Sequence, residues 1–336
     1  MTQSVAQSKT SPFAPVPRIH VDDLAANDVA HLFGGATPLI VEGLDGHWPE
    51  AYRGRGVDAF ARFDRPINSV YVAGRQVFGV SDADFVARVT AGENVRVFGA
   101  RLAPDVVDAC SRPAWLYDRL QAHGVFRNND DRPHSFIGAG KAITPLHYDL
   151  EVNLIWHLAL AGERQVYLWT QDQSPNLFKL PVLGISPIPF ARGRLGYRFA
   201  QGYATTLKPG ELLYMPAGCW HQVEYSGAPS AAMTYGLHAT REDQAEGVAR
   251  GNFWRGFISF TQGIGRGRWR AWAALPLMLP LAWYAGLYIA VNFLSARTPN
   301  VVGRPVRRAV EALDRRVFRL YAPLMKYFRR RLWIGL

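Results

Sequence analysis

The sequence predicts a mainly β domain with flanking helices, arranged as a double-stranded β-helix, or jelly roll, and followed by a helical C-terminal appendage. Residues 134–240 fall into seven short β-rich segments separated by Gly, Pro or polar turns, a pattern typical of a jelly roll. The residues before them contain helical segments that would lie outside the jelly roll. No residue from Ala271 to Ala296 is charged, and the chain that follows is rich in Arg, so the appendage differs in composition from the domain.

The N-terminal residues are predicted to be a disordered lead-in because Ser, Thr, Gln and Pro dominate them. They contain neither a charged n-region nor an apolar h-region, so no signal peptide is predicted. The changes in composition along the chain then give five parts. These are the lead-in (1–17), the jelly-roll domain (18–240), a linker or helical segment (241–270), an apolar segment (271–296) and a basic amphipathic helical tail (297–336).

Within the domain, a short strand, a helix capped by Asp22 or Asp23 and the apolar strand "PLIVEGL" come first. A hairpin turning at Ala73 and Gly74 is predicted next. Ser81 then has the position of an N-cap, with Asp84 three residues later, so a helix is predicted to follow it. Another helix is predicted over 113–123.

The jelly-roll strands are the seven segments "HSFIGAG", "TPLHYD", "NLIWHLAL", "RQVYLWT", "GYATTLKPGELLYMPAG", "WHQVEYS" and "SAAMTYGLHAT". Pro209 and Gly210 form a turn into one strand, and Ala217 and Gly218 form a turn out of it. The strand after that turn contains His221.

A candidate metal site follows from the spacing of His147 and Asp149 in "TPLHYD". Residues i and i+2 of a strand point to the same face, so both side chains would reach into one space. His221, from another strand, would complete a set of two histidines and one carboxylate. This set suits non-heme Fe(II), because it leaves coordination positions open on one side.

Separate blocks of the sequence, in the right order, resemble the JmjC and cupin-like Fe(II)/2-oxoglutarate oxygenases. The main blocks are "TPLHYDLEVNLIWHLALAGERQVYLW" and "LKPGELLYMPAGCWHQV", and "ATPLIVEGLDGHWPEA" and "SFIGAG" add to them. The most similar branch contains the asparaginyl hydroxylase that acts on hypoxia-inducible factor. The resemblance extends from about Ile19 to Thr240 and implies Fe(II), 2-oxoglutarate and O₂. The implied activity is a hydroxylation coupled to oxidative decarboxylation of 2-oxoglutarate to succinate.

The resemblance also implies which residues hold the cosubstrate. In the resembled branch a lysine and a threonine bind the far carboxylate of 2-oxoglutarate, and Arg164 and Thr144 stand at these positions. Arginine pairs with a carboxylate in a bidentate manner, but its longer reach would shift the cosubstrate, so a different 2-oxo acid is also considered. The alternative for Arg164 is a plain surface charge.

Three further polar residues have less definite roles. Asn153 matches an asparagine beside the cosubstrate, or bonds its local backbone at a strand end. His157 is interpreted as a core histidine. Gly236 and His238 replace an asparagine and a tryptophan of the branch, so His238 is a candidate hydrogen-bond donor in the substrate pocket. The sequence does not identify the substrate, which is a protein side chain or a small molecule. It also leaves open whether the reaction is a hydroxylation or a demethylation.

Two other interpretations of the domain remain. A jelly roll can hold zinc or manganese, or keep its shell without catalysis. The alternative function is therefore a membrane-tethered cupin-like metal-binding protein without oxygenase turnover. The two cysteines, Cys110 and Cys219, argue against a disulfide framework and fit a reducing, cytoplasmic compartment.

The basic charge of the chain is concentrated in the tail. The net charge is +11, and residues 297–336 hold eleven Arg and Lys against Glu311 and Asp314. The domain therefore has little excess charge, and specific nucleic-acid recognition is not predicted.

The appendage is long enough for a membrane, since about 20 apolar residues span the hydrocarbon core. Pro276 and Pro280 would interrupt a straight helix, and both flanks are basic, which favours the cytoplasmic side for both. We therefore expect residues 271–336 to lie at the cytoplasmic face of a membrane. The alternatives are a spanning helix and a homodimerisation module.

Overall fold

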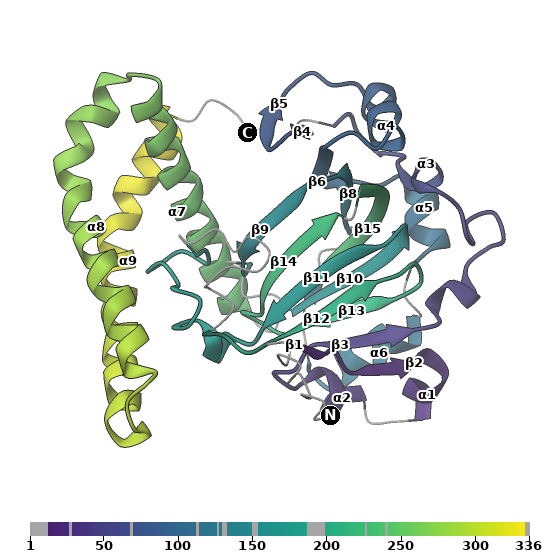
Figure 1. Ribbon diagram of the computed structural model, residues 1–336, viewed down its shortest axis with the longest axis horizontal. Helices are drawn as coiled ribbons and strands as arrows, with labels where there is room; N and C mark the ends of the chain where they lie inside the picture. Colours follow the sequence, from purple (N-terminus) through teal and green to yellow (C-terminus); the bar gives the residue numbers. More distant parts are fainter. Residues whose placement is uncertain are drawn as a thin grey trace, which may run out of the picture.

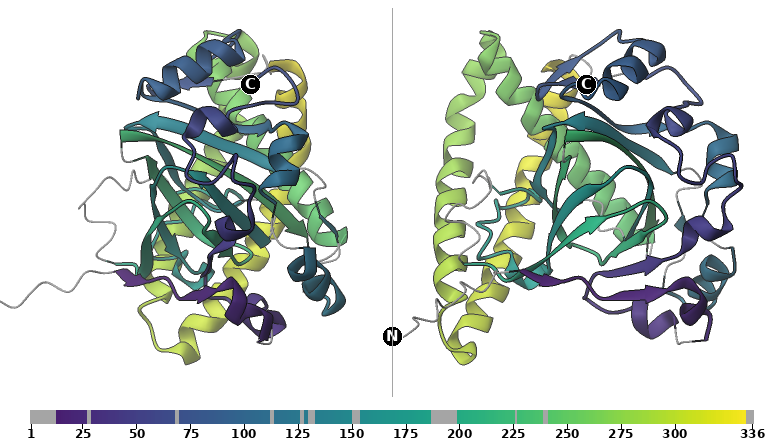
Figure 2. Two further views of the ribbon diagram at one scale, coloured as in Figure 1. Left: turned by 90° about the vertical axis from the view of Figure 1, so that its right-hand side faces the viewer. Right: turned by 45° about the vertical axis from the view of Figure 1, so that its right-hand side comes forward.

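The computed structural model describes residues 13–26, 29–67, 70–111, 114–125, 128–129, 133–149, 154–186, 199–225, 227–238 and 241–332. Two β-sheets face each other and form the predicted jelly roll (Figures 1 and 2). The smaller sheet has the strand order β1-β12-β11-β14-β9. The larger sheet has the order β2-β3-β13-β10-β15-β8-β6-β4-β5, and β7 pairs with β15.

Neighbouring strands run antiparallel except in the pairs β1–β12 and β2–β3. The strands of the smaller sheet are β1 (Phe13–Pro15), β9 (Ile143–His147), β11 (Arg164–Trp169), β12 (Gly202–Leu207) and β14 (Trp220–Tyr225). Those of the larger sheet are β2 (Arg18–His20), β3 (Leu39–Glu42), β4 (Val70–Val72), β5 (Arg75–Val77), β6 (Val95–Arg101), β7 (Asn128–Asn129), β8 (His134–Gly140), β10 (Leu154–Ala161), β13 (Leu212–Met215) and β15 (Gly227–His238).

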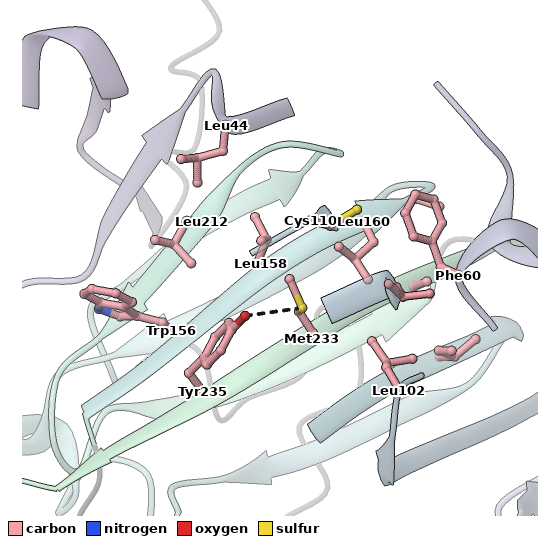
Figure 3. Close-up of a cluster of buried hydrophobic side chains, with 14 of the residues drawn as sticks. Leu44, Phe60, Leu102, Cys110, Trp156, Leu158, Leu160, Leu212, Met233 and Tyr235 are labelled. Atoms are coloured by element: carbon pink, nitrogen blue, oxygen red, sulfur yellow. Dashed lines mark hydrogen bonds between the residues drawn. The ribbon is translucent and has the colours of Figure 1, made fainter. Parts of the chain in front are cut away.

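Strand β10 is buried on both faces, which explains its nearly continuous apolar sequence. Ile155 and Ala159 face the core between the two sheets. Trp156, Leu158 and Leu160 face the opposite way, into a second core outside the larger sheet (Figure 3). Alternate residues of this one strand thus contribute to two cores: the core between the two sheets, and the outer core between the larger sheet and the short helices.

Short helices cover that outer core (Figure 1). They are α1 (Val21–Ala26), α2 (Val29–Phe33), α3 (Val57–Phe60), α4 (Asp82–Thr90), α5 (Pro104–Ala109) and α6 (Ala114–Ala122), with 3₁₀ turns at Leu44–His47 and Gln171–Gln173. The predicted N-cap is found, because Ser81 Oγ accepts the Asp84 N–H at 3.1 Å. The predicted hairpin turn is also found, with positive φ at Ala73 and Gly74.

The prediction of a disordered lead-in is wrong for its last residues. Phe13–Pro15 form β1, which pairs in parallel with β12. The Phe13 ring packs against Tyr167 and Trp169, with ring centres 5.2 and 5.6 Å apart, and this apolar contact holds the strand in place. Residues 1–12 lie outside the described residues.

Three long helices form a layer at one side of the jelly roll (Figures 1 and 2). They are α7 (Arg241–Gly265), α8 (Trp269–Ser295) and α9 (Asn300–Leu332). The segment expected to be a linker or helical is thus mostly helix. The interruption expected at Pro276 and Pro280 does not occur, since α8 continues through both. Both prolines are exposed, so their rings project away from the helices packed on the other face.

The layer formed by α7, α8 and α9 contacts the jelly roll through the loop that follows the 3₁₀ turn Gln171–Gln173 and extends to residue 186. Val182 and Leu183 are buried in the core of the three helices. The Val182 N–H donates to the carboxylate of Asp314, on α9, at 2.9 and 3.1 Å. Val182 has φ 64°, an unfavourable conformation for a β-branched residue, so this contact holds the loop in a strained shape.

Candidate functional site

The structure brings His147, Asp149 and His221 together at the edge of the smaller sheet. His147 is the last residue of β9 and faces His221 of β14 in the strand register. Asp149 follows two residues after the strand. One ligand atom from each lies within 4.8 Å of the others. Among the described residues, they are the one group of His, Cys, Asp and Glu side chains arranged to share an ion.

Backbone carbonyls orient both imidazoles. His147 Nδ1 lies 2.7 Å from Pro145 O, and His221 Nδ1 lies 3.1 Å from Cys219 O. A proton on each Nδ1 therefore has an acceptor, which leaves the Nε2 lone pair free for a metal ion. His147 Nε2 is 3.6 Å from Asp149 Oδ1, so these two ligand atoms already point toward one space.

Electrostatics keep most of this set ready for a cation. Burial alone would raise the pKa of Asp149, but the His147 hydrogen bond and the neighbouring histidine charges lower it to about 2. Burial and the nearby His147 lower the pKa of His221 to about 4. The pKa of His147 is raised, because Asp149 outweighs the opposing effect of burial. Near neutral pH the site thus holds an ionised carboxylate and at least one neutral imidazole.

The donor set fits Fe(II). Two imidazole nitrogens and one carboxylate form the 2-His-1-carboxylate triad, which occupies one side of the ion and leaves the other side open. A structural zinc site would instead have four protein ligands, and the described residues supply three.

Arg164, at the start of β11, is a buried cation that lacks an anion. It is 1% exposed, and its Nη1 and Nη2 lie 3.2 Å from His157 Nε2 and Phe136 O. Its Nε has no hydrogen-bond partner, and no Asp or Glu pairs with it in the described part of the chain. The interpretation of Arg164 as a surface charge is therefore wrong. A charge buried in this way calls for an anionic ligand, because an uncompensated buried charge is costly.

His157 positions this arginine. Burial and the Arg164 charge lower its pKa well below the usual value, so the imidazole is neutral. Its Nδ1–H can donate to Thr234 Oγ1 at 2.6 Å, which leaves Nε2 to accept from Arg164. The prediction of a core histidine agrees with its burial, but the structure adds this hydrogen-bonding role.

Arg96, on β6, is a second cation that sequence reasoning missed. Its Nη1 donates to Thr144 Oγ1 at 2.9 Å and to Ile143 O at 2.6 Å. Its guanidinium also lies 5.1 Å from the ring centre of Tyr71. Burial lowers its pKa, and no described carboxylate pairs with it. The available signal was a charge between two apolar residues in "VRV", a strand position where a cation needs a partner.

The two arginines both lie near β8. Phe136 O accepts from Arg164, and Gly138, two residues further on, pairs with Arg96 in the register. A Cβ on Gly138 would lie 2.9 Å from the Tyr225 ring and 3.0 Å from Arg96. The Arg164 guanidinium lies 5.2 Å from the centre of that same ring. The absence of a side chain at Gly138 thus lets Tyr225 lie close to both cations.

The sequence pattern of the cupin-like domain matches residues 28–236, more than half of the chain. The chain belongs to the cupin-like domain family. The matched region contains the strands of both sheets except β1, β2 and the end of β15, together with the three metal-ligand candidates and both arginines.

This cupin-like chain is also similar to lysine-specific demethylase JMJ31 of Arabidopsis thaliana. The two are 26% identical over 99 residues, which cover 26% of this chain and 18% of the relative. The matched part of this chain therefore spans a small part of that protein. The similarity supports a JmjC-type cupin domain, but it does not extend the demethylase activity of the relative to this chain. The narrower resemblance to the asparaginyl hydroxylase branch stays a prediction.

The structure does not join His238 to this centre and does not test Asn153. Asn153 lies outside the described residues. His238, at the end of β15, is 4% exposed and its Nδ1 has no hydrogen-bond partner among the described residues. It is not a member of the three-ligand group. Its role as a pocket donor stays a prediction.

Proposed function

We propose that this cupin-like protein is an Fe(II)- and 2-oxoglutarate-dependent oxygenase, and that it hydroxylates its substrate. The observation that carries the proposal is the open three-ligand set of His147, Asp149 and His221 in the same jelly roll as a buried, anion-free Arg164. A metal-binding protein without turnover needs the ligands but has no use for the buried cation.

The roles of the residues follow from their contacts. His147, Asp149 and His221 hold Fe(II), which supplies O₂ activation for the oxidation of a C–H bond when bound. Arg164 pairs with the C5 carboxylate of 2-oxoglutarate, aligned by His157. The Arg96 N–H occupies one lone pair of the Thr144 hydroxyl, so the Thr144 proton is free to donate to the same carboxylate.

The second arginine makes the pocket more cationic than one lysine would. Two guanidinium groups near one carboxylate favour a dianionic 2-oxo acid over a monoanionic one. The length of the diacid is a separate question, because a guanidinium extends further than an ammonium. Oxaloacetate and 2-oxoadipate, one carbon shorter and longer, are therefore the comparison cosubstrates.

The test measures release of succinate from 2-oxoglutarate by the Fe(II)-loaded protein with ascorbate, including turnover without a substrate. His147→Ala should abolish the release, and His123→Ala, at an exposed position, should not. A protein that binds Fe(II) but releases no product from any of the three 2-oxo acids would support the metal-binding alternative.

To identify the substrate, extracts are compared from cells that contain either the active protein or the Asp149→Ala variant. Mass spectrometry of proteins, small molecules and lipids should reveal a product that is heavier by one oxygen atom. Loss of a methyl group instead would identify the reaction as demethylation, the activity in the name of the similar Arabidopsis protein.

A further inference from the structure

From residue 272 onward, the exposed face of α8 is wholly apolar. We define the α8 apolar face as the residues of this helix from 272 onward that are exposed: Trp272, Ala273, Pro276, Leu277, Leu279, Pro280, Ala282, Trp283, Gly286, Leu287, Ala290 and Leu294. Trp283 is 83% exposed and Leu287 is 61% exposed. A surface helix of a soluble protein has its polar residues on that side, so an apolar surface in contact with water is unfavourable here.

The buried face of α8 is more polar than its exposed face. It contains Tyr288, Asn292 and Ser295 as well as the apolar residues Ala271, Ala274, Met278 and Leu281, and Asn292 and Ser295 make their hydrogen bonds to the helix backbone. The more polar side therefore packs against α7 and α9, and the less polar side points away from the protein. Figures 1 and 2 show most of α8 on the outer side of the helical layer, and its C-terminal end contacts the jelly-roll domain, where Phe293 packs against Phe178 and Phe199. This arrangement fits a helix whose outer environment is apolar.

The neighbouring helix argues against simple spanning. α8 has the length and hydropathy of a membrane span, and 17% of its most apolar window is buried. However, Tyr321 of α9 contacts the Leu277 carbonyl, and Arg307 contacts the Ser295 carbonyl. α9 therefore follows α8 for most of its length. From Arg307 to Tyr321, α9 has five arginines, counting Arg307 itself, which a spanning α8 would draw into hydrocarbon.

The charge around the face is positive at both ends. Arg266 and Arg270 lie near the start of α8, and Arg297 and Arg304 lie after its end; all four are exposed. From residue 266 onward the sequence has fourteen Arg and Lys against Glu311 and Asp314, and Asp314 is buried. An apolar face between two basic ends complements an anionic lipid surface, in which headgroup charge lies above acyl chains.

A second copy of the chain is a poorer occupant. A two-fold dimer would place two α8 apolar faces together, either parallel or antiparallel. In both cases the arginines at the ends of one helix meet the arginines of the other, because each end is basic. Like charges at close range oppose association, whereas phosphate headgroups neutralise them.

We propose that the α8 apolar face inserts into the headgroup–acyl boundary of an anionic leaflet, with the helix axis in the membrane plane and the arginines of α9 on lipid phosphates. The cytoplasmic leaflet is the natural partner, because it is rich in anionic lipid. The protein would thus be monotopic, with both termini of α8 on one side. The proposal does not depend on oxygenase activity, since every residue that carries it lies outside the jelly roll.

The first experiment is vesicle flotation of the full-length protein. Vesicles of phosphatidylcholine alone are compared with vesicles that also contain about 30% phosphatidylglycerol, at low and high salt. We expect binding to the anionic vesicles that weakens with salt. The double variant Leu277→Glu/Trp283→Glu should reduce partitioning at least tenfold. Val248→Glu, at a 55% exposed position on α7, is the matched control and should bind as the parent does.

Two further experiments test the contribution of the arginine charges to vesicle binding and the depth of Trp283 in the bilayer. Arg304→Gln/Arg308→Gln should weaken binding several-fold and flatten the salt dependence. Lipids brominated near the headgroup should quench tryptophan fluorescence more than lipids brominated at the chain end, and Trp283→Phe should lose much of that quenching. Circular dichroism and the melting temperature of each variant establish that it is folded.

Three outcomes would overturn the proposal. The first is a double glutamate variant that floats as the parent does. The second is a stable dimer that ignores both vesicle types and becomes monomeric in that variant, which would identify a second copy as the occupant. The third is protease access to a C-terminal tag only from the far side of sealed vesicles, which would show that the helix spans.

Discussion

Arg164 Nη1 lies 3.2 Å from His157 Nε2, deep inside the jelly roll and with no carboxylate at either side chain among the described residues. The arrangement requires a neutral imidazole, because a protonated Nε2 could not accept from a guanidinium. The hydrogen bond therefore connects the protonation of one residue to the position of the other.

The first prediction concerns the pH dependence of stability. The pKa of His157 is about 6.5 in the unfolded chain and well below its usual value in the fold, mainly because of burial. Below pH 6.5 the unfolded chain binds the additional proton, so stability falls as the pH drops from 6.5 toward the folded pKa. The contribution approaches about 1.4 kcal/mol per pH unit in that window.

The measurement is urea unfolding of the metal-free protein between pH 7.5 and 5.5. His157→Asn should lose stability less steeply with acid than the parent, whatever its stability at neutral pH. His123→Asn, at an exposed position, should follow the parent. Parallel curves for the parent and His157→Asn would contradict a neutral buried His157.

The second prediction concerns Arg164 and the cosubstrate. Arg164→Ala should raise the KM for 2-oxoglutarate at least about 30-fold, since removing a buried charge-assisted pair costs about 2 kcal/mol or more. Arg164→Lys should recover part of the loss. Arg75→Ala, an exposed arginine on β5, is the control. A KM within about twofold of the parent in Arg164→Ala would place the cation elsewhere.

The third prediction separates charge from hydrogen bonding at Arg96. Arg96→Gln keeps a donor for Thr144 but removes the charge, and we expect it to raise the KM for 2-oxoglutarate about tenfold. Arg96→Lys should stay closer to the parent, and kcat should change less than KM in both. An unchanged KM in Arg96→Gln would mean that Arg96 only supports the strand.

The fourth prediction is that metal binding needs all three ligands and not His238. Replacement of His147, Asp149 or His221 by Ala should lower the bound Fe(II) and abolish succinate release. His238→Ala should keep its iron, because His238 is outside the ligand group. Metal analysis after dialysis measures this. Full iron occupancy in two ligand variants would exclude the assigned centre.

The fifth prediction concerns the turn before Arg164. Gly162 has φ 62°, and a Cβ there would collide with the backbone of Pro229. Gly162→Ala should destabilise the protein by about 2 kcal/mol or more, from strain and collision together. Gly124→Ala is matched, with φ 70° and open space, and should cost about 1 kcal/mol. Equal losses of unfolding free energy in Gly162→Ala and Gly124→Ala would show that the backbone at Pro229 moves aside and adds no cost.

Local patterns in the sequence were enough for much of the site. The His147–Asp149 spacing depends on neighbouring residues, so it could be interpreted without knowing the fold, although Asp149 lies just beyond the end of β9. The alternation of apolar residues predicted the strands, and the caps and turns around Ser81 and Gly74 depend on a few adjacent residues. Arg164 was found through its place in a resembled motif.

Tertiary structure decided the contacts between distant residues. Arg96 joins the site because β6 lies beside β8, which brings it to Thr144, 48 residues away in the chain. Asp314 anchors a loop 132 residues earlier. The direction of the α8 apolar face was decided by packing of α7 and α9 against its other side. Strand order, helix docking and the pairing of buried charges depend on the summed packing of the whole chain, which no local window of sequence contains.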